Sequence, residues 1–228
     1  AELAKGDYIL LLNDDIEIIQ EDWLDKMLEK AMLPHVGAVG VKLLYPGSNT
    51  IQHAGITNIR LGPAHKLQFR DDRNDYYFLR NRLCFDVLGV TGACLMVKKS
   101  TYEAAGGLSE TLRVAFNDVE LCYHLYDMGY VNVVRNDVAL YHHESLSRGM
   151  DDSVEKLKRL HQELNLLYEL HPSIYVQDPF YHRYLVRDVL DQEFYAGNRY
   201  EYTDRCDRAE PEALRDGLRP EWSNEVLR

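Results

Sequence analysis

Hydrophobic and polar positions alternate in blocks along the first part of the chain. Residues 7–13 (DYILLLN) form an apolar run, typical of a central parallel strand buried on both faces. Residues 21–32 carry apolar side chains at helical spacing, and Pro34 ends that helix. Residues 36–45 (VGAVGVKLLY) predict the next strand. Strand, helix and strand form a βαβ unit, which predicts an α/β domain.

Further elements follow from turn signals and periodicity. Residues 46–82 predict long loops with a strand or two, residues 92–97 a strand, and residues 100–105 a short helix closed by Gly106 and Gly107. Residues 117–128 predict a helix, and residues 131–145 a pair of strands. From residue 153 an apolar stripe predicts a helix that Pro172 stops. We expect an α/β domain over residues 1–150 and a helical, tyrosine-rich extension over residues 151–228.

Composition and net charge limit the classes of molecule that the protein is expected to bind. The 228 residues are 46% hydrophobic and carry no apolar run of the ~20 residues that cross a bilayer. A net charge of −11 argues against nucleic acid as a partner, and is compatible with an anionic ligand bound through a metal ion. Cys84, Cys94, Cys122 and Cys206 are scattered, which predicts reduced thiols and a cytoplasmic protein.

An acidic triplet, Asn13-Asp14-Asp15, follows the first predicted strand. In open α/β sheets, ligands bind beyond the carboxyl ends of the strands. Carboxylates there suit Mg²⁺ or Mn²⁺, which can hold a diphosphate. The triplet alone is equally compatible with an Asx-turn.

A second cluster lies at the start of the helix predicted from residue 117. Asn117 and Glu120 match a capping box, which leaves Asp118 unexplained in the first turn. A carboxylate there could accept a proton from a substrate hydroxyl. It could also serve only to stabilise the helix dipole.

A third cluster is LYHHESLSRG. His142 and His143 are adjacent at a strand end and point to opposite faces, so at most one is expected to join a given site. Imidazole suits a Mn²⁺ shell, and Arg148 could pair with phosphate. A lone histidine is more often an ordinary surface or core residue, so only the combination favours a site.

Taken together, the motifs resemble a family 2 glycosyltransferase. They are YILLLNDDIEI, VGAVGVKLLYP, IQHAGI, VTGACLMVKK, GGLSETLRVAFNDVELCYHLYDMGY, LYHHESLSRG and DPFYHRYL, in this order. The chain is most similar to the bacterial branch of O-antigen, rhamnan and related surface-polysaccharide synthesis. The resemblance implies a GT-A-type (Rossmann-like) mixed sheet flanked by helices, and inverting sugar transfer from a UDP-, dTDP- or GDP-linked donor.

On the donor side, the resemblance places the acidic triplet in the position of the DXD motif. Asp15 would bind the Mn²⁺ or Mg²⁺ cofactor, with Asn13 and Asp14 approaching the donor. His142 best matches the third metal ligand, and His143 is its close rival. Arg148 would contact the diphosphate. Asn13 departs from the aspartate that opens many such motifs.

On the acceptor side, Asp118 matches the family's general base. The acceptor, a saccharide or lipid-linked saccharide, would meet residues around it: Thr91, Gly92, Ala93, Asn117 and Glu120. Acceptors of this kind imply association with the inner membrane surface. Inversion needs one base and a Lewis acid for the departing diphosphate, and no covalent nucleophile.

Two further expectations concern the extent of the protein and the alternative functions. The family's nucleobase-binding strand and loop would precede AELAKGDYILLLNDD, so we expect a partial domain that is either a fragment of a larger glycosyltransferase or a truncated version of one. A nucleotidyltransferase also uses paired carboxylates and Mg²⁺, and would form diphosphate bonds from a nucleoside triphosphate. A non-catalytic remnant would bind saccharide or a partner without metal.

Overall fold

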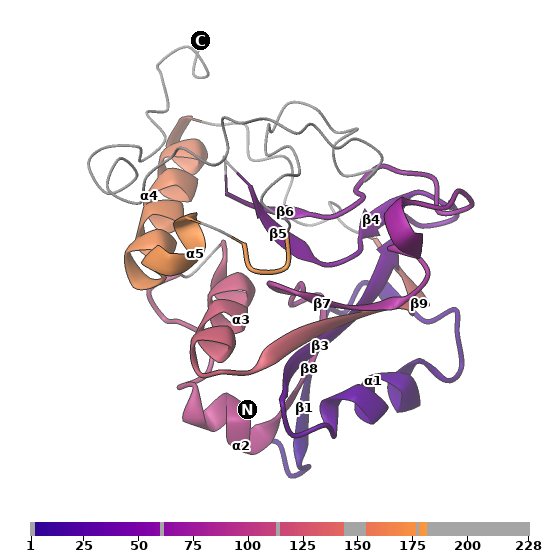
Figure 1. The fold of residues 1–228 in the computed structure, drawn as a ribbon, viewed down its shortest axis with the longest axis horizontal. Helices are drawn as coiled ribbons and strands as arrows, with labels where there is room; N and C mark the ends of the chain where they lie inside the picture. Colours follow the sequence, from indigo (N-terminus) through magenta and orange to yellow (C-terminus); the bar gives the residue numbers. More distant parts are fainter. Residues whose placement is uncertain (1–2, 60–61, 113–114, 144–153, 177, 182–228) are drawn as a thin grey trace.

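The computed structural model describes residues 3–59, 62–112, 115–143, 154–176 and 178–181 (Figure 1). In this part of the chain, a seven-stranded sheet has as its main order β1 (Tyr8–Leu12), β8 (Cys94–Lys98), β3 (Val36–Leu44), β9 (Val131–His142) and β2 (Ile16–Glu17). Two more strands join it: β4 (Ile51–His53) beside β3, and β7 (Cys84–Val87) beside β9. A separate hairpin is formed by β5 (Ile56–Ile59) and β6 (Gly62–His65).

The strand directions bring three carboxyl ends to one edge of the sheet. β3 and β9 are parallel, whereas β8 is antiparallel to both β1 and β3. β1 therefore runs in the same direction as β3 and β9. The end of β1, which leads into the acidic triplet, and the end of β9, which carries His142, face the same side of the domain.

Helices cover both faces of the sheet, which confirms the predicted mixed α/β architecture (Figure 1). α1 (Trp23–Ala31) packs on one face, where Val39 and Val41 of β3 point toward it. α2 (Lys99–Ala104) and α3 (Asn117–Asp127) pack on the other face, where Ala38 of β3 points. This alternation along one strand is the pleat expected of a sheet buried on both sides.

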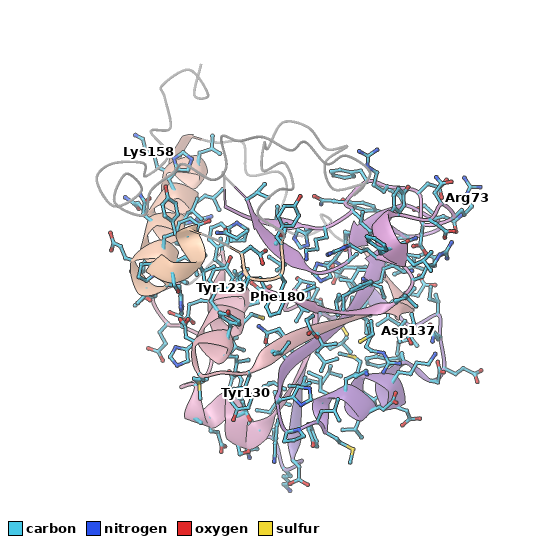
Figure 2. The ribbon with its side chains drawn as sticks, viewed as in Figure 1. Arg73, Tyr123, Tyr130, Asp137, Lys158 and Phe180 are labelled. Carbon is cyan, nitrogen blue, oxygen red and sulfur yellow. The ribbon has the colours of Figure 1, made fainter. Side chains whose placement is uncertain are left out.

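The C-terminal helices complete a further layer. α4 (Val154–Leu170) and α5 (Pro172–Val176) contribute Leu164, Leu167 and Ile174 to a core shared with Val119 and Tyr123 of α3. Figure 2 shows Tyr123 and Phe180 at this junction. The described part of the predicted extension therefore shares a core with the α/β domain. No helix among the described residues is long and apolar enough to cross a membrane.

Two strand predictions are wrong in detail. In the described sheet β1 is an outer strand, antiparallel to its neighbour β8, and Leu12 is 42% exposed. An apolar run does not show which strand pairs beside it, and within β1 only Ile9 is buried. Residues 131–142 form one strand instead of two, because β9 passes a register shift between Arg135 and Ala139 without turning back.

The cysteine prediction agrees with the described residues. Cys84, Cys94 and Cys122 are free, and Cys206 lies outside the described residues. Burial raises the pKa of the Cys94 and Cys122 thiols to about 12, so both are unreactive core residues.

Candidate functional site

The carboxyl end of β9 brings His142 beside the acidic triplet. β2 pairs with β9 so that Ile16 lies opposite His142. His142 Nε2 then lies 3.2 Å from Asp15 Oδ1 and 3.2 Å from Asn13 Nδ2. Residues from two distant segments, both predicted as site residues, thus meet at one point.

The contact between Asp15 and His142 fits a divalent metal ion. Asp15 Oδ1 is buried and has no hydrogen-bond partner among the described residues, although His142 Nε2 lies within ion-pair distance. A buried carboxylate oxygen without a donor is costly, and a cation bound to both the oxygen and the nitrogen would remove that cost. In the described ranges, no group of three or more His, Cys, Asp or Glu side chains could hold a metal. Asp15 and His142 would therefore need further ligands, such as phosphate oxygens or water.

His143 points away from this contact, as adjacent strand residues do. Its Nε2 lies 2.9 Å from Glu17 Oε2, and its backbone N–H donates to the carbonyl of Asp15. The geometry therefore favours His142 over His143 as a candidate ligand. Asp14 is exposed beside the site, and Arg148 lies outside the described residues.

A chain of backbone hydrogen bonds connects the triplet with Asp118. The N–H of Asn13 donates to the carbonyl of Ala93 over 3.0 Å. The N–H of the preceding residue, Gly92, donates to Asp118 Oδ2 over 2.6 Å, and Asp118 Oδ1 accepts the N–H of Val119. Thr91 Oγ1 accepts the N–H of Ala93 and shapes the same turn. The structure thus connects Asn13, which lies beside Asp15 in the triplet, with Asp118 through the loop before β8.

The predicted capping box is wrong. The residue that precedes α3 is Phe116, which adopts a left-handed conformation (φ 62°) and forms no side-chain cap. Asn117 is therefore the first helical residue instead of the cap. Because Glu120 does not reach back to such a cap, its carboxylate is available for a contact elsewhere.

Glu120 instead faces the junction of α4 and α5. Its Oε1 lies 3.4 Å from Nε2 of buried His171, whose Nδ1 contacts Asp127 Oδ2 at 2.6 Å. Burial opposes the charge of His171, but hydrogen bonds to Glu120 and Asp127 outweigh it and raise the pKa. The acceptor-side role of Glu120 and Asn117 stays a prediction.

Gln52 of β4 is a site residue that the motifs did not single out. Its side-chain Oε1 lies 2.7 Å from His142 Nδ1, and its Nε2 donates to the His142 carbonyl over 3.3 Å. The available signal was a polar residue within a short strand whose other residues are buried. Such a residue needs a hydrogen-bond partner, but the sequence does not say which one.

Comparison with curated proteins gives two relatives. The chain is 40% identical over 191 residues to the uncharacterized protein y4gI of Sinorhizobium fredii. The aligned region covers 82% of this chain and 21% of the relative. The chain is 37% identical over 153 residues to the O-antigen biosynthesis protein RfbC of Myxococcus xanthus, 66% of this chain and 12% of the relative. The chain therefore matches only a minor part of the length of either relative. No family model matches it.

Among solved structures, the chain resembles the mannosyltransferase PcManGT of Pyrobaculum calidifontis in complex with GDP-Man and Mn²⁺. The sequence identity is 16% and the TM-score 0.46, over 74% of this chain and 40% of that one. A score of this size does not establish a shared fold.

Proposed function

We propose that this chain is part of an inverting, metal-dependent family 2 glycosyltransferase with a GT-A-type fold. It would transfer a sugar from a UDP-, dTDP- or GDP-linked donor to a saccharide or lipid-linked acceptor in surface-polysaccharide synthesis. The observation that carries the proposal is the link from Asn13 to Asp118 through the backbone of Ala93 and Gly92, because Asn13 also contacts His142 beside Asp15. The similarity to RfbC, an O-antigen biosynthesis protein, supports a saccharide product.

Asp118 is proposed as the general base that takes the proton of the acceptor hydroxyl. Each of its oxygens accepts one backbone N–H, from Gly92 and Val119, which fixes the direction of the carboxylate. A carboxylate oxygen has two lone-pair sites, so each retains capacity for a further hydrogen bond. The acceptor hydroxyl would approach there, and its oxygen would attack the anomeric carbon as the diphosphate leaves. Thr91 and Ala93 would line the same side.

On the donor side, Asp15 and His142 would hold Mn²⁺ or Mg²⁺, with Asn13 and Asp14 near the nucleotide sugar. When bound, such a metal supplies Lewis-acid stabilisation of the leaving diphosphate. A metal ion at this position is supported by the buried Asp15 Oδ1, which has no hydrogen-bond partner among the described residues. Because both curated relatives are much longer, we also propose that further domains of a larger enzyme act with this one. A lipid-linked acceptor would place the enzyme at the cytoplasmic membrane surface.

The test is transfer from a panel of UDP-, dTDP- and GDP-sugars by the protein and by Asp118→Asn. We expect the substitution to lower kcat about 100-fold or more, because the acceptor loses its base. Asp25→Asn is the matched control, since Asp25 also lies in the first turn of a helix, α1, away from the site. Unchanged transfer by correctly folded Asp118→Asn would refute the base assignment.

The products separate the alternatives. A glycosyltransferase releases a nucleoside diphosphate from a nucleotide sugar, whereas a nucleotidyltransferase releases pyrophosphate from a nucleoside triphosphate. Saccharide binding that persists in Asp15→Ala without metal, and without any transfer, would favour a non-catalytic module.

A further inference from the structure

We propose that Gln52 is a positioning residue that holds His142 in the tautomer whose Nε2 lone pair faces Asp15. The inference rests on the proposed function, because it concerns how a candidate metal ligand is prepared. Gln52 lies in the IQHAGI segment, to which the proposed chemistry assigns no role.

Both ends of the Gln52 amide contact the same residue. Nε2 donates to the His142 carbonyl, and Oε1 faces His142 Nδ1 at 2.7 Å. A carbonyl oxygen only accepts hydrogen bonds, so rotating the amide by half a turn would place oxygen against oxygen. Gln52 Oε1 must therefore face Nδ1, and Nδ1 must carry the proton that it donates.

The tautomer of His142 follows from this. A neutral imidazole carries one N–H, so a protonated Nδ1 leaves a lone pair on Nε2. One neighbour agrees with that assignment. Asn13 Nδ2, which can only donate, lies 3.2 Å from Nε2.

Burial makes the Gln52 amide hard to replace. Gln52 is 3% exposed and His142 is 8% exposed, so bulk water does not compete for these hydrogen bonds. The flanking strand residues Ile51 and His53 are paired with β3, which holds Gln52 in place. Removing the amide would leave Nδ1 with no acceptor in a buried position.

In this tautomer, His142 is already prepared to bind a metal ion through Nε2. Nε2 faces a carboxylate oxygen with its lone pair before any metal arrives, so binding requires no ring flip and no proton transfer between the two nitrogens. Hydrogen-bond partners of this kind behind a ligating histidine typically change metal affinity about 10–100-fold.

The test measures both the tautomer and the metal affinity. Ring ¹⁵N–¹H correlation spectra of the metal-free protein report which His142 nitrogen is protonated, and electron paramagnetic resonance follows Mn²⁺ binding. We expect the Nδ1–H form in the native protein. Gln52→Met should shift His142 toward the Nε2–H form and weaken Mn²⁺ binding about 10–100-fold. Gln68→Met, which removes an amide bonded to Tyr45, is the matched control and should change neither.

A second variant covers the case in which Gln52→Met does not fold. Gln52→Glu loses the donor to the His142 carbonyl but keeps an acceptor for Nδ1, so it should retain the Nδ1–H form. An Nε2–H form in the native protein, or a native tautomer and Mn²⁺ affinity in folded Gln52→Met, would overturn the inference. If the native protein binds no Mn²⁺, the metal-dependent function fails, while the tautomer measurement still decides the role of Gln52.

Discussion

Gly92 packs so closely against Asp118 that a Cβ at position 92 would make an unusually tight contact with the Asp118 side chain. The Gly92 N–H donates to Asp118 Oδ2 over 2.6 Å, and a Cβ added to Gly92 would lie 3.1 Å from Asp118 Cβ and 3.4 Å from Oδ2. The loop before β8 therefore lies directly against the first turn of α3. With no side chain at position 92, the backbone N–H reaches Asp118 without displacing its carboxylate.

This relationship predicts that Gly92→Ala impairs catalysis more than folding. The added methyl group should displace the Asp118 carboxylate by a few tenths of an ångström and weaken its hydrogen bond, lowering kcat about 10-fold or more. Mn²⁺ affinity should change little, because Asp15 and His142 do not contact the new group. Steady-state kinetics and metal titration check this. Gly6→Ala, where the added Cβ meets only ordinary contacts from 3.6 Å outward, is the control.

Lys42 is predicted to stabilise the fold through a buried ion pair. Its ammonium donates to both oxygens of Asp72, over 2.8 and 3.0 Å, and to the Asn81 carbonyl over 2.8 Å. Lys42→Met leaves the Asp72 carboxylate, 13% exposed, without its counter-charge, and should cost about 3–5 kcal/mol in the free energy of unfolding. Urea denaturation measures this.

The matched comparison is the exposed pair of Arg73 and Asp71, at the outer edge of the molecule (Figure 2). Arg73→Met should cost about 0–1 kcal/mol, because solvent screens such pairs. If Lys42→Met and Arg73→Met lowered the free energy of unfolding by equal amounts, burial would not set the strength of the Lys42–Asp72 pair.

Lys66 is predicted to make stability rise with pH in the alkaline range. Its Nζ is buried without a hydrogen-bond partner among the described residues, and burial lowers its pKa from the ordinary 10.5 to about 8. Between these two values the unfolded chain binds more protons at Lys66 than the folded chain does. The free energy of unfolding should therefore gain a positive slope from about pH 8 upward.

Lys66→Met isolates this contribution. At about pH 7 the variant should be more stable than the native protein, by about 1–3 kcal/mol, because it no longer buries an ammonium that lacks a hydrogen-bond partner among the described residues. The advantage should shrink by about pH 9.5, where native Lys66 is mostly neutral when folded. Denaturation at both pH values checks this, and an advantage independent of pH would contradict it.

Local patterns in the sequence were sufficient for most elements. The helix from Trp23, the buried strand β3 and the helix that ends before Pro172 were predicted because apolar spacing reports directly which side of a segment is covered. The same patterns flagged Asp15 and Asp118, since acidic side chains directly after a strand or at a helix start stand out from both periodicities. These inferences need only residues within a few positions of one another.

The tertiary structure decided what depends on distant residues. Asn13 contacts His142 across 129 positions and Gln52 contacts it across 90, and neither spacing is visible in a local pattern. The antiparallel neighbour of β1 was missed for the same reason, because β8 lies more than 80 positions away along the chain. Apolar periodicity determines which face of an element is buried. Which strand lies beside it, and which side chains then meet, follows from packing of the whole chain.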